Sequence, residues 1–294
     1  MASVIYNQPF TNFDPNKAAN VGLTGSVTDA TSTHIGIRDG SYSVDMKGIF
    51  IYSGTKLMGR VSEISYSKDG STYMTASELG YNLSGSVPAS FYEGDDKYLG
   101  SSGNDLFNAW LGNDKYDGGA GTDTVYYSAS KSDFTVKASG NGLILDGLGK
   151  TDSLVNIERV KFDDGTLAVD INVGQNAGSG YRLYQAAFDR KPDNYGLKYW
   201  INDLDNGRSL QQVAKGFVDS AEFKALNPGQ DQNSLINNFY QHVLHRDADA
   251  GGLQYWNGKM SGGMTAAEVL VSFSESQENI ANVAPDLNNG LWLM

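Results

Sequence analysis

A period of nine residues in the middle of the chain restricts its fold more than any other feature. Four consecutive blocks each carry glycine at the fourth position, aspartate at the sixth and a large apolar or aromatic residue at the eighth. The blocks are FYEGDDKYL (91–99), GSSGNDLFN (100–108), AWLGNDKYD (109–117) and GGAGTDTVY (118–126). Because three columns keep their register over four blocks without a gap, each block is predicted to be one repeated structural unit.

In each block, six residues are expected to turn the chain and three to form a short strand. Two blocks then complete one flattened right-handed coil, and the side chain at the eighth position points inward. It stacks on its counterpart one coil away, at the roughly 4.8 Å spacing of neighbouring strands. Glycine at the fourth position permits a left-handed backbone and leaves carbonyl oxygens accessible.

Such a coil brings together aspartates that lie two blocks apart. It pairs Asp96 with Asp114 and Asp105 with Asp123. Two carboxylates at close range repel each other unless a cation lies between them. Calcium suits this place because it takes about six to eight carboxylate and carbonyl oxygens in a flexible geometry, whereas magnesium prefers a tight octahedron. The candidate calcium ligands are Gly94, Asp96, Gly100, Ser102, Gly103, Asp105, Gly112, Asp114, Gly118, Ala120, Gly121 and Asp123.

The two candidate sites are expected to differ in affinity. The Asp105/Asp123 pair has glycine at the first position of both blocks, followed by serine or glycine. The Asp96/Asp114 pair has phenylalanine, tyrosine, alanine and tryptophan at those places, and bulky side chains there limit close backbone approach. We therefore expect calcium to bind well between Asp105 and Asp123, and weakly or not at all between Asp96 and Asp114.

The blocks resemble the nonapeptide repeats of RTX proteins, which form the hemolysin-type calcium-binding β-roll. GGAGTDTVY (118–126) matches the full consensus, and the other three blocks match it in part. The segment 125–170 also resembles the β segment that often follows such repeats. The resemblance implies calcium binding, secretion and a C-terminal signal for a type I apparatus. A glycine-rich hairpin array without metal is the alternative.

Two coils bury little surface and leave open strand edges, so each end of the roll is expected to carry a cap. Alternating residues predict strands in 35–90 and 127–172, and SKDGST (67–72) predicts a tight turn between two strands. The expected fold class is a multidomain β + α chain, with a parallel β-roll in a β-rich N-terminal part and an all-α helical-repeat domain. The expected domains are a β-rich cap at 1–90, the roll at 91–126, a β cap at 127–172 and the two-repeat domain at 181–294, which ends in a tail similar to a secretion signal.

The C-terminal part repeats with an offset of 56 residues, so that YRLYQAAFDRKPDNYGLKYW (181–200) aligns with NNFYQHVLHRDADAGGLQYW (237–256). Apolar residues three and four apart predict three helices in each unit, after a polar linker at 171–180. The aspartates Asp193 and Asp249 are expected to cap the second helix of each unit, and Ser209 and Thr265 the third.

The aromatic columns of this repeat are expected to form core contacts, and a sugar-stacking platform is the alternative. The region resembles a helical domain of unknown function that occurs in bacterial secreted proteins beside RTX repeats. DADAGGLQYWNG (247–258) has an aspartate pattern similar to an EF-hand loop. It is rejected as a calcium site because Gly258 stands where a bidentate glutamate is needed.

The composition and the absence of certain motifs exclude several classes of function. A net charge of −12 disfavours nucleic acid as a partner, and the absence of cysteine excludes disulfides and thiol catalysis. No HExxH, GxSxG or phosphate-binding glycine loop accompanies the three histidines, so we expect no enzyme. No apolar window approaches the length of a transmembrane helix, and the first 20 residues lack the pattern of a Sec signal.

The sequence predicts a secreted calcium-binding structural or adhesive protein, outside the cell or at its surface, whose β-roll folds on extracellular calcium after type I export. Expected partners are calcium ions, the type I secretion apparatus and a cell-surface glycan or protein. The alternative is an extracellular polysaccharide-active enzyme or glycan-binding module, with its active face in residues 1–90. In a third hypothesis, residues 181–294 mediate protein–protein assembly.

Overall fold

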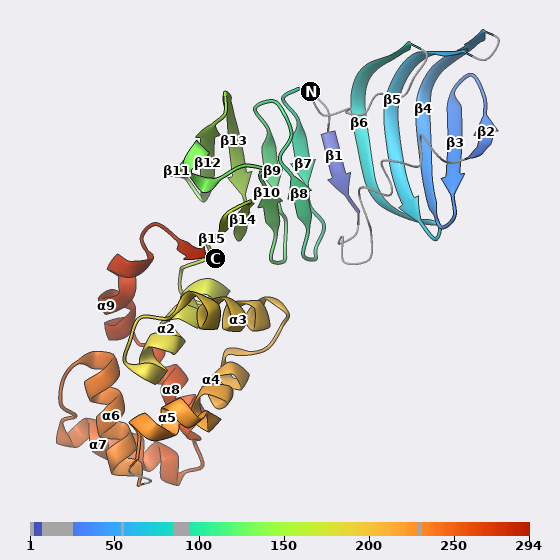
Figure 1. Cartoon of the computed structure of the whole chain (residues 1–294). Coiled ribbons are helices and arrows are strands. Elements are labelled where there is room, and N and C mark those ends of the chain that lie inside the picture. Colours follow the sequence, from blue (N-terminus) through green and yellow to red (C-terminus); the bar gives the residue numbers. More distant parts are fainter. Residues whose placement is uncertain (1–2, 8–25, 54–55, 85–93, 229–230) are drawn as a thin grey trace. The chain divides into compact units, whose positions relative to one another are not determined.

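The computed structural model describes residues 3–7, 26–53, 56–84, 94–228 and 231–294. It divides the chain into two compact units, Met1–Asp164 and Gly165–Met294 (Figure 1). The described part of the first unit is built mainly of strands, and that of the second mainly of helices. This is the predicted β + α fold class. Much of the expected N-terminal cap, and Phe91 and Tyr92 of the first block, lie outside the described residues.

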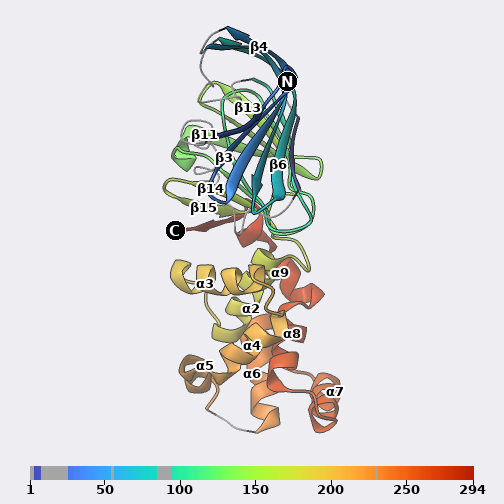
Figure 2. The same ribbon diagram turned by 90° about the vertical axis from the view of Figure 1, so that its right-hand side faces the viewer.

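The N-terminal part of the first unit is an antiparallel arrangement of long strands. Alternating burial along them, as over residues 42–50, places apolar side chains on one face. The predicted turn lies at Asp69 and Gly70, which both have positive φ. Shifts of register at Lys47/Gly48 and at Val61/Glu63 accompany the bend of this sheet that Figures 1 and 2 show. The strands are β1 (Ser3–Tyr6), β2 (Ser26–Ala30), β3 (His34–Asp39), β4 (Tyr42–Ser53), β5 (Lys56–Lys68) and β6 (Ser71–Ser84).

The four blocks form the predicted coil. Each contributes a three-residue strand at its seventh to ninth positions: β7 (Lys97–Leu99), β8 (Leu106–Asn108), β9 (Lys115–Asp117) and β10 (Thr124–Tyr126). Strands two blocks apart pair in parallel, β7 with β9 and β8 with β10. The eighth-position side chains are buried, and the rings of Tyr98 and Tyr116 stack with centroids 4.7 Å apart.

Further strands flank the roll on both sides. β1 pairs in parallel with β7 and antiparallel with β6, so it joins the roll to the long strands. After the roll come the 3-10 helix Lys131–Asp133 and the strands β11 (Phe134–Ser139), β12 (Gly142–Gly147), β13 (Lys150–Val155) and β14 (Arg159–Phe162). β13 pairs in parallel with β9, and β14 with β10. The larger sheet therefore runs β11-β12-β13-β9-β7-β1-β6-β5-β4-β3-β2.

The described residues of the second unit form two sets of four helices rather than the expected two sets of three. The reason is a serine in the same repeat column, since Ser220 and Ser276 each accept a backbone N–H and start a fourth helix. The unit runs β15 (Gly165–Ala168), α2 (Asn176–Phe188), α3 (Asn194–Asp205), α4 (Leu210–Asp219), α5 (Ala221–Leu226), α6 (Gln232–Leu244), α7 (Ala250–Ser261), α8 (Ala266–Ser274), α9 (Gln277–Leu287) and β16 (Leu291–Leu293). None of these helices is both long and apolar enough to cross a membrane.

The expected linker at 171–180 is only partly a linker, because α2 begins at Asn176. The carboxylate of Asp170 accepts the N–H of Ala177 and satisfies one of the free amides at the start of this helix. A Cβ at Gly178 would lie 2.1 Å from the carbonyl oxygen of Ile171, so glycine allows the chain to pass close to the helix.

The predicted helix caps are confirmed. Asp193 and Asp249 accept the N–H groups of Gly196 and Gly252, and Ser209 and Thr265 cap α4 and α8. Since Ala250–Ser261 is helical, the segment similar to an EF-hand forms no loop that could enclose calcium.

The repeated tryptophans take part in the core. Trp200 contacts Phe217 and Trp256 contacts Phe273, with ring centroids 4.7 and 5.0 Å apart. The neighbouring Tyr199 and Tyr255 are about half exposed. A sugar-stacking role for these tyrosines stays a prediction.

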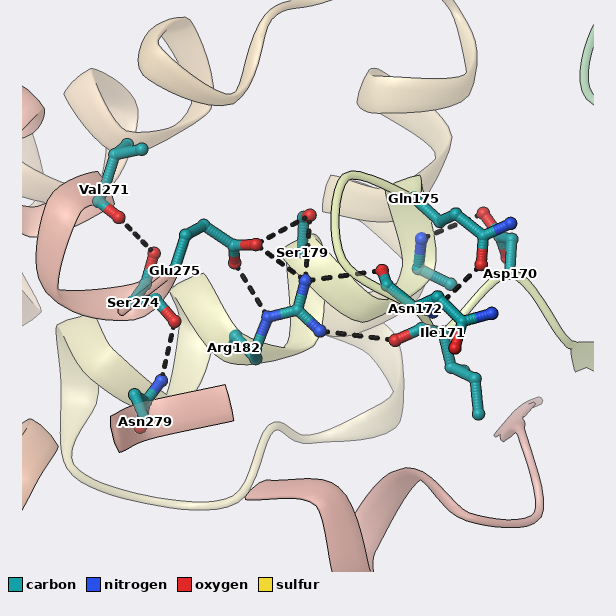
Figure 3. A network of polar contacts seen from close by, with 11 residues as sticks. Asp170, Ile171, Asn172, Gln175, Ser179, Arg182, Val271, Ser274, Glu275 and Asn279 are labelled. Atoms are coloured by element: carbon teal, nitrogen blue, oxygen red, sulfur yellow. Dashed lines mark hydrogen bonds and ion pairs between the residues drawn. The ribbon is translucent and has the colours of Figure 1, made fainter. Parts of the chain in front are cut away.

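A buried arginine ties the first helix of this unit to its C-terminal half. Arg182 donates from Nε and Nη2 to the two carboxylate oxygens of Glu275, at 2.8 and 2.7 Å. On its other side, Nη1 donates to the carbonyl of Ile171 and Nη2 to that of Asn172 (Figure 3). The segment before α2 is thereby fixed to the end of α8.

The C-terminal tail is folded into this unit. Its strand β16 pairs antiparallel with β15, and Leu291 and Leu293 are buried. A role of the tail in export stays a prediction.

Candidate calcium site

The sixth-position aspartates form a ladder through the roll. The backbone N–H of Asp96 donates to Oδ1 of Asp114 at 2.9 Å, and that of Asp105 to Oδ1 of Asp123 at 2.7 Å. All four residues are buried. The spacing of two blocks therefore brings together the predicted pairs, and a backbone amide of one coil bonds to the carboxylate of the next.

The ladder continues to two residues that the sequence analysis missed. The N–H of Asp114 donates to Oδ1 of Asp152, and that of Asp123 to Oε2 of Glu158. The β11–β12 hairpin interrupts the nine-residue frame, and these two acids are only six positions apart, so no period reveals them. One sequence pattern could have indicated Asp152. The stretch GLGKTDSLV (147–155) has aspartate at the sixth position of a nine-residue block and a leucine, which is buried, at the eighth.

A second ladder joins the fifth positions. The N–H of Asn113 donates to Oδ1 of Asp95, that of Thr122 to Oδ1 of Asn104, and that of Thr151 to Oδ1 of Asn113. In this ladder the donor lies in the later block and the acceptor in the earlier one, whereas the aspartate ladder has the opposite direction. Together the two ladders fix the register of successive loops, so that each loop lies directly over the equivalent loop of the next coil.

The Asp105/Asp123 pair has two carboxylate oxygens that the protein does not satisfy. Oδ2 of Asp105 accepts the N–H and the hydroxyl of Ser101, and Oδ1 of Asp123 accepts the N–H of Asp105. Oδ1 of Asp105 and Oδ2 of Asp123 are buried and have no hydrogen-bond donor among the described residues. Burial of anionic oxygens without a partner is costly, and a cation is the partner that would offset this cost.

Two backbone carbonyl oxygens, those of Gly118 and Asn156, lie near the same pair. A Cβ at Gly100 would lie 2.0 Å from the carbonyl oxygen of Gly118 and 3.0 Å from Oδ2 of Asp105. A Cβ at Gly118 would lie 2.1 Å from the carbonyl oxygen of Asn156 and 2.5 Å from Oδ2 of Asp123. The missing side chains thus let carboxylate and carbonyl oxygens converge, and these are the ligands that calcium takes.

The carboxylate of Asp114, in the other pair, differs from that of Asp123. Oδ1 of Asp114 accepts the N–H of Asp96, and its Oδ2 accepts the hydroxyl of Tyr116 at 3.1 Å. Each oxygen of Asp114 therefore has a donor from the protein. This difference between Asp114 and Asp123 is in line with weaker calcium binding at Asp96/Asp114. The unequal affinities of the two sites stay a prediction.

The other predicted ligands lie in the same stacked loops. Gly112 and Gly121 have positive φ, and they pack on the carbonyl groups of Gly94 and Gly103 respectively. Ser102 and Ala120 are exposed, and their part in binding stays a prediction. The described residues contain no group of three or more His, Asp or Glu side chains able to hold a metal ion. An ion at Asp105/Asp123 would therefore need backbone carbonyls to complete its ligands.

The buried carboxylates of the roll resist ionisation. Burial, together with the nearby Glu158 and Asp105 carboxylates, raises the pKa of Asp123 to about 8. Burial likewise raises the pKa of Asp114 to about 6, and that of Asp105 above its usual range. Ionised carboxylates are thus unfavourable in the roll unless a cation is present.

Without calcium, the stability of the roll is expected to fall as the pH rises from the ordinary carboxyl pKa of 3.8 towards 8. In this interval the folded state holds protons that the unfolded chain releases, so raising the pH favours unfolding. The measurement is the thermal unfolding midpoint in chelator at about pH 5 and about pH 8. Asp123→Asn should flatten the dependence, and a midpoint of the wild type that rises with pH would contradict this assignment.

Comparison with known families agrees with this geometry. Residues 92–125 match the RTX calcium-binding nonapeptide repeat, in four copies. This chain carries RTX repeats. RTX repeats bind calcium ions, so calcium is the ion of the stacked loops, and such repeats are typical of secreted proteins. Residues 181–227 and 228–283 each match a domain of unknown function, DUF4214, and the two matches correspond to the two sets of four helices.

No curated protein matches the chain. Among solved structures, the extracellular lipase LipA from Serratia marcescens is similar at 22% identity, with a TM-score of 0.16. The match covers 24% of this chain and 13% of the lipase chain, so this chain corresponds to only a small part of that enzyme's length.

Proposed function

We propose that this chain is a secreted, non-catalytic protein whose RTX roll closes on extracellular calcium after type I export, and which then serves as an adhesive or structural component at a cell surface. The observation that carries the proposal is the pair of buried oxygens without donors, Oδ1 of Asp105 and Oδ2 of Asp123. They belong to carboxylates that lie near backbone carbonyl oxygens, in loops whose register is already fixed.

The calcium dependence follows from the charges of the roll. Closing the coils buries Asp105 and Asp123 and brings the acidic Glu158 next to Asp123 in the same ladder. Where calcium is scarce, this burial opposes folding. Bound calcium would neutralise the carboxylates of Asp105 and Asp123 and join their coils. Binding to the folded state alone stabilises it by about 2.7 kcal/mol at a hundredfold excess over Kd.

Secretion is supported by the sequence rather than by the geometry of the site. RTX repeats are typical of secreted proteins, and a chain without cysteine forms no disulfide that would hinder passage through an export channel. The proposed partners are calcium ions, a type I secretion apparatus and a glycan or protein of the cell surface.

The proposal predicts that calcium added to the chelated full chain increases the β signal in far-UV circular dichroism and protects residues 94–164 from proteolysis. Magnesium at the same concentration should have little effect, because it dehydrates reluctantly. For the surface role, calcium-loaded chain should remain on washed cells of the producing organism and be released by chelator. Identical spectra and cleavage with and without calcium would remove the basis of the proposal.

A further inference from the structure

A degenerate fifth repeat follows the four RTX blocks. In GLGKTDSLV (147–155), the register of β13 on β9 places Leu154 opposite Tyr116, and therefore Asp152 opposite Asp114. The same register places Lys150 opposite Gly112, at the fourth position. All four regular blocks have glycine there, whereas the fifth has the long cationic side chain of lysine.

The Lys150 ammonium lies between two oxygen ligands of the kinds that calcium would take. Its Nζ donates to the carbonyl oxygen of Trp110 at 2.5 Å and lies 3.1 Å from Oδ2 of Asp152. Trp110 belongs to the turn of the third block, so the ammonium bridges two successive coils. It also lies 4.9 Å from the ring centroid of Tyr127, in cation–π contact. The Lys150 side chain is only 11% exposed.

The carboxylate of Asp152 is consequently satisfied by the protein alone. Its Oδ1 accepts the N–H of Asp114, and its Oδ2 accepts the hydroxyl of Tyr127 at 2.9 Å together with the Lys150 ammonium. Asp152 is fully buried. In the other column, Asp105 and Asp123 each keep one oxygen without a donor among the described residues, so Asp152 differs from them in having its positive charge supplied by the protein.

We propose that Lys150 is a built-in replacement for calcium in the coil formed by the turns 109–114 and 147–152. The lysine supplies the positive charge that a bound ion supplies between Asp105 and Asp123. This end of the roll is therefore closed without metal, and the number of calcium ions per chain is lower by one than the number of stacked loop pairs would allow. The inference rests on calcium binding by the neighbouring RTX coils.

The test uses the full chain and three substitutions. Lys150→Gly restores the repeat residue and opens the place of the ammonium, so equilibrium dialysis at saturating calcium should find one additional ion per chain relative to the wild type. In chelator the same variant should unfold several degrees lower, because Asp152 loses its counter-charge. Lys150→Arg keeps the charge and should bind as many ions as the wild type.

Lys150→Met decides the case if Lys150→Gly does not fold. It keeps most of the aliphatic volume against Tyr127 but has no charge, and its unfolding midpoint in chelator should fall by several degrees while that of Lys150→Arg falls less. An unchanged midpoint of Lys150→Met in chelator would overturn the proposal, as would unchanged calcium stoichiometry in a folded Lys150→Gly. A wild type that binds no calcium would count against the proposed function, whereas the chelator measurement would still test Lys150 as the counter-charge of Asp152.

Discussion

Asp123→Asn is expected to remove most of the stabilisation that calcium gives to the chain. At a calcium concentration a hundredfold above Kd, the wild type should gain about 2.7 kcal/mol in the free energy of unfolding, and the variant only a small part of it. The asparagine oxygen can still accept the N–H of Asp105, so the ladder is retained while the charge is lost. The measurement is urea unfolding in chelator and in excess calcium.

The same variant should be more stable than the wild type in chelator. Asp123 is fully buried and burial raises its pKa to about 8, so asparagine removes a charge that the calcium-free fold disfavours. Opposite effects in the two conditions distinguish loss of a calcium ligand from simple damage to the fold.

Asp114→Asn is the matched control, because Asp114 has the same position in its block and is equally buried. Both of its oxygens already accept donors from the protein, so its replacement should leave most of the calcium response intact. If Asp114→Asn abolishes the response and Asp123→Asn does not, the assignment of the stronger site is wrong.

Arg182→Met is expected to lower the free energy of unfolding of the helical unit by about 3–5 kcal/mol, as is usual when one partner of a buried ion pair is removed. Glu275 would lose two hydrogen bonds from the guanidinium, and the carbonyl of Ile171 would lose a donor. Urea unfolding of the full chain in excess calcium, followed by the helical signal in circular dichroism, measures the change.

Arg246→Met is the control for this substitution. Arg246 also binds a glutamate with two hydrogen bonds, but both partners of its pair with Glu278 are more than 40% exposed. Exposed ion pairs contribute about 0–1 kcal/mol, so this variant should lose much less stability. Equal losses in the two variants would show that burial of Arg182 does not determine its contribution.

Local repetition explains how much of this fold the sequence predicts. The nine-residue period implies short strands, because turn glycines and inward apolar residues at fixed intervals constrain the backbone within each block. The same period places Asp105 over Asp123, which is the basis of the candidate calcium site. In the helical unit, Asp193 and Asp249 cap helices through contacts three residues away, so the sequence alone indicates them.

Residues that lie outside the repeats could be placed only from the tertiary structure. The hairpin β11–β12 separates Asp152 and Glu158 from the repeats, and only the pairing of β13 and β14 with the roll places them in the aspartate ladder. The parallel pairing of β1 with β7 also joins segments about 90 residues apart.

The coil, its register and the acidic pairs can be predicted from the residue pattern, because each follows from contacts at a constant spacing along the chain. Only the folded chain shows which carboxylates keep oxygens without donors, where Lys150 supplies the positive charge, and that Arg182 binds Glu275. Whether a buried charge has a partner depends on every group that packs around it, and those groups come from segments whose separation in sequence follows no rule.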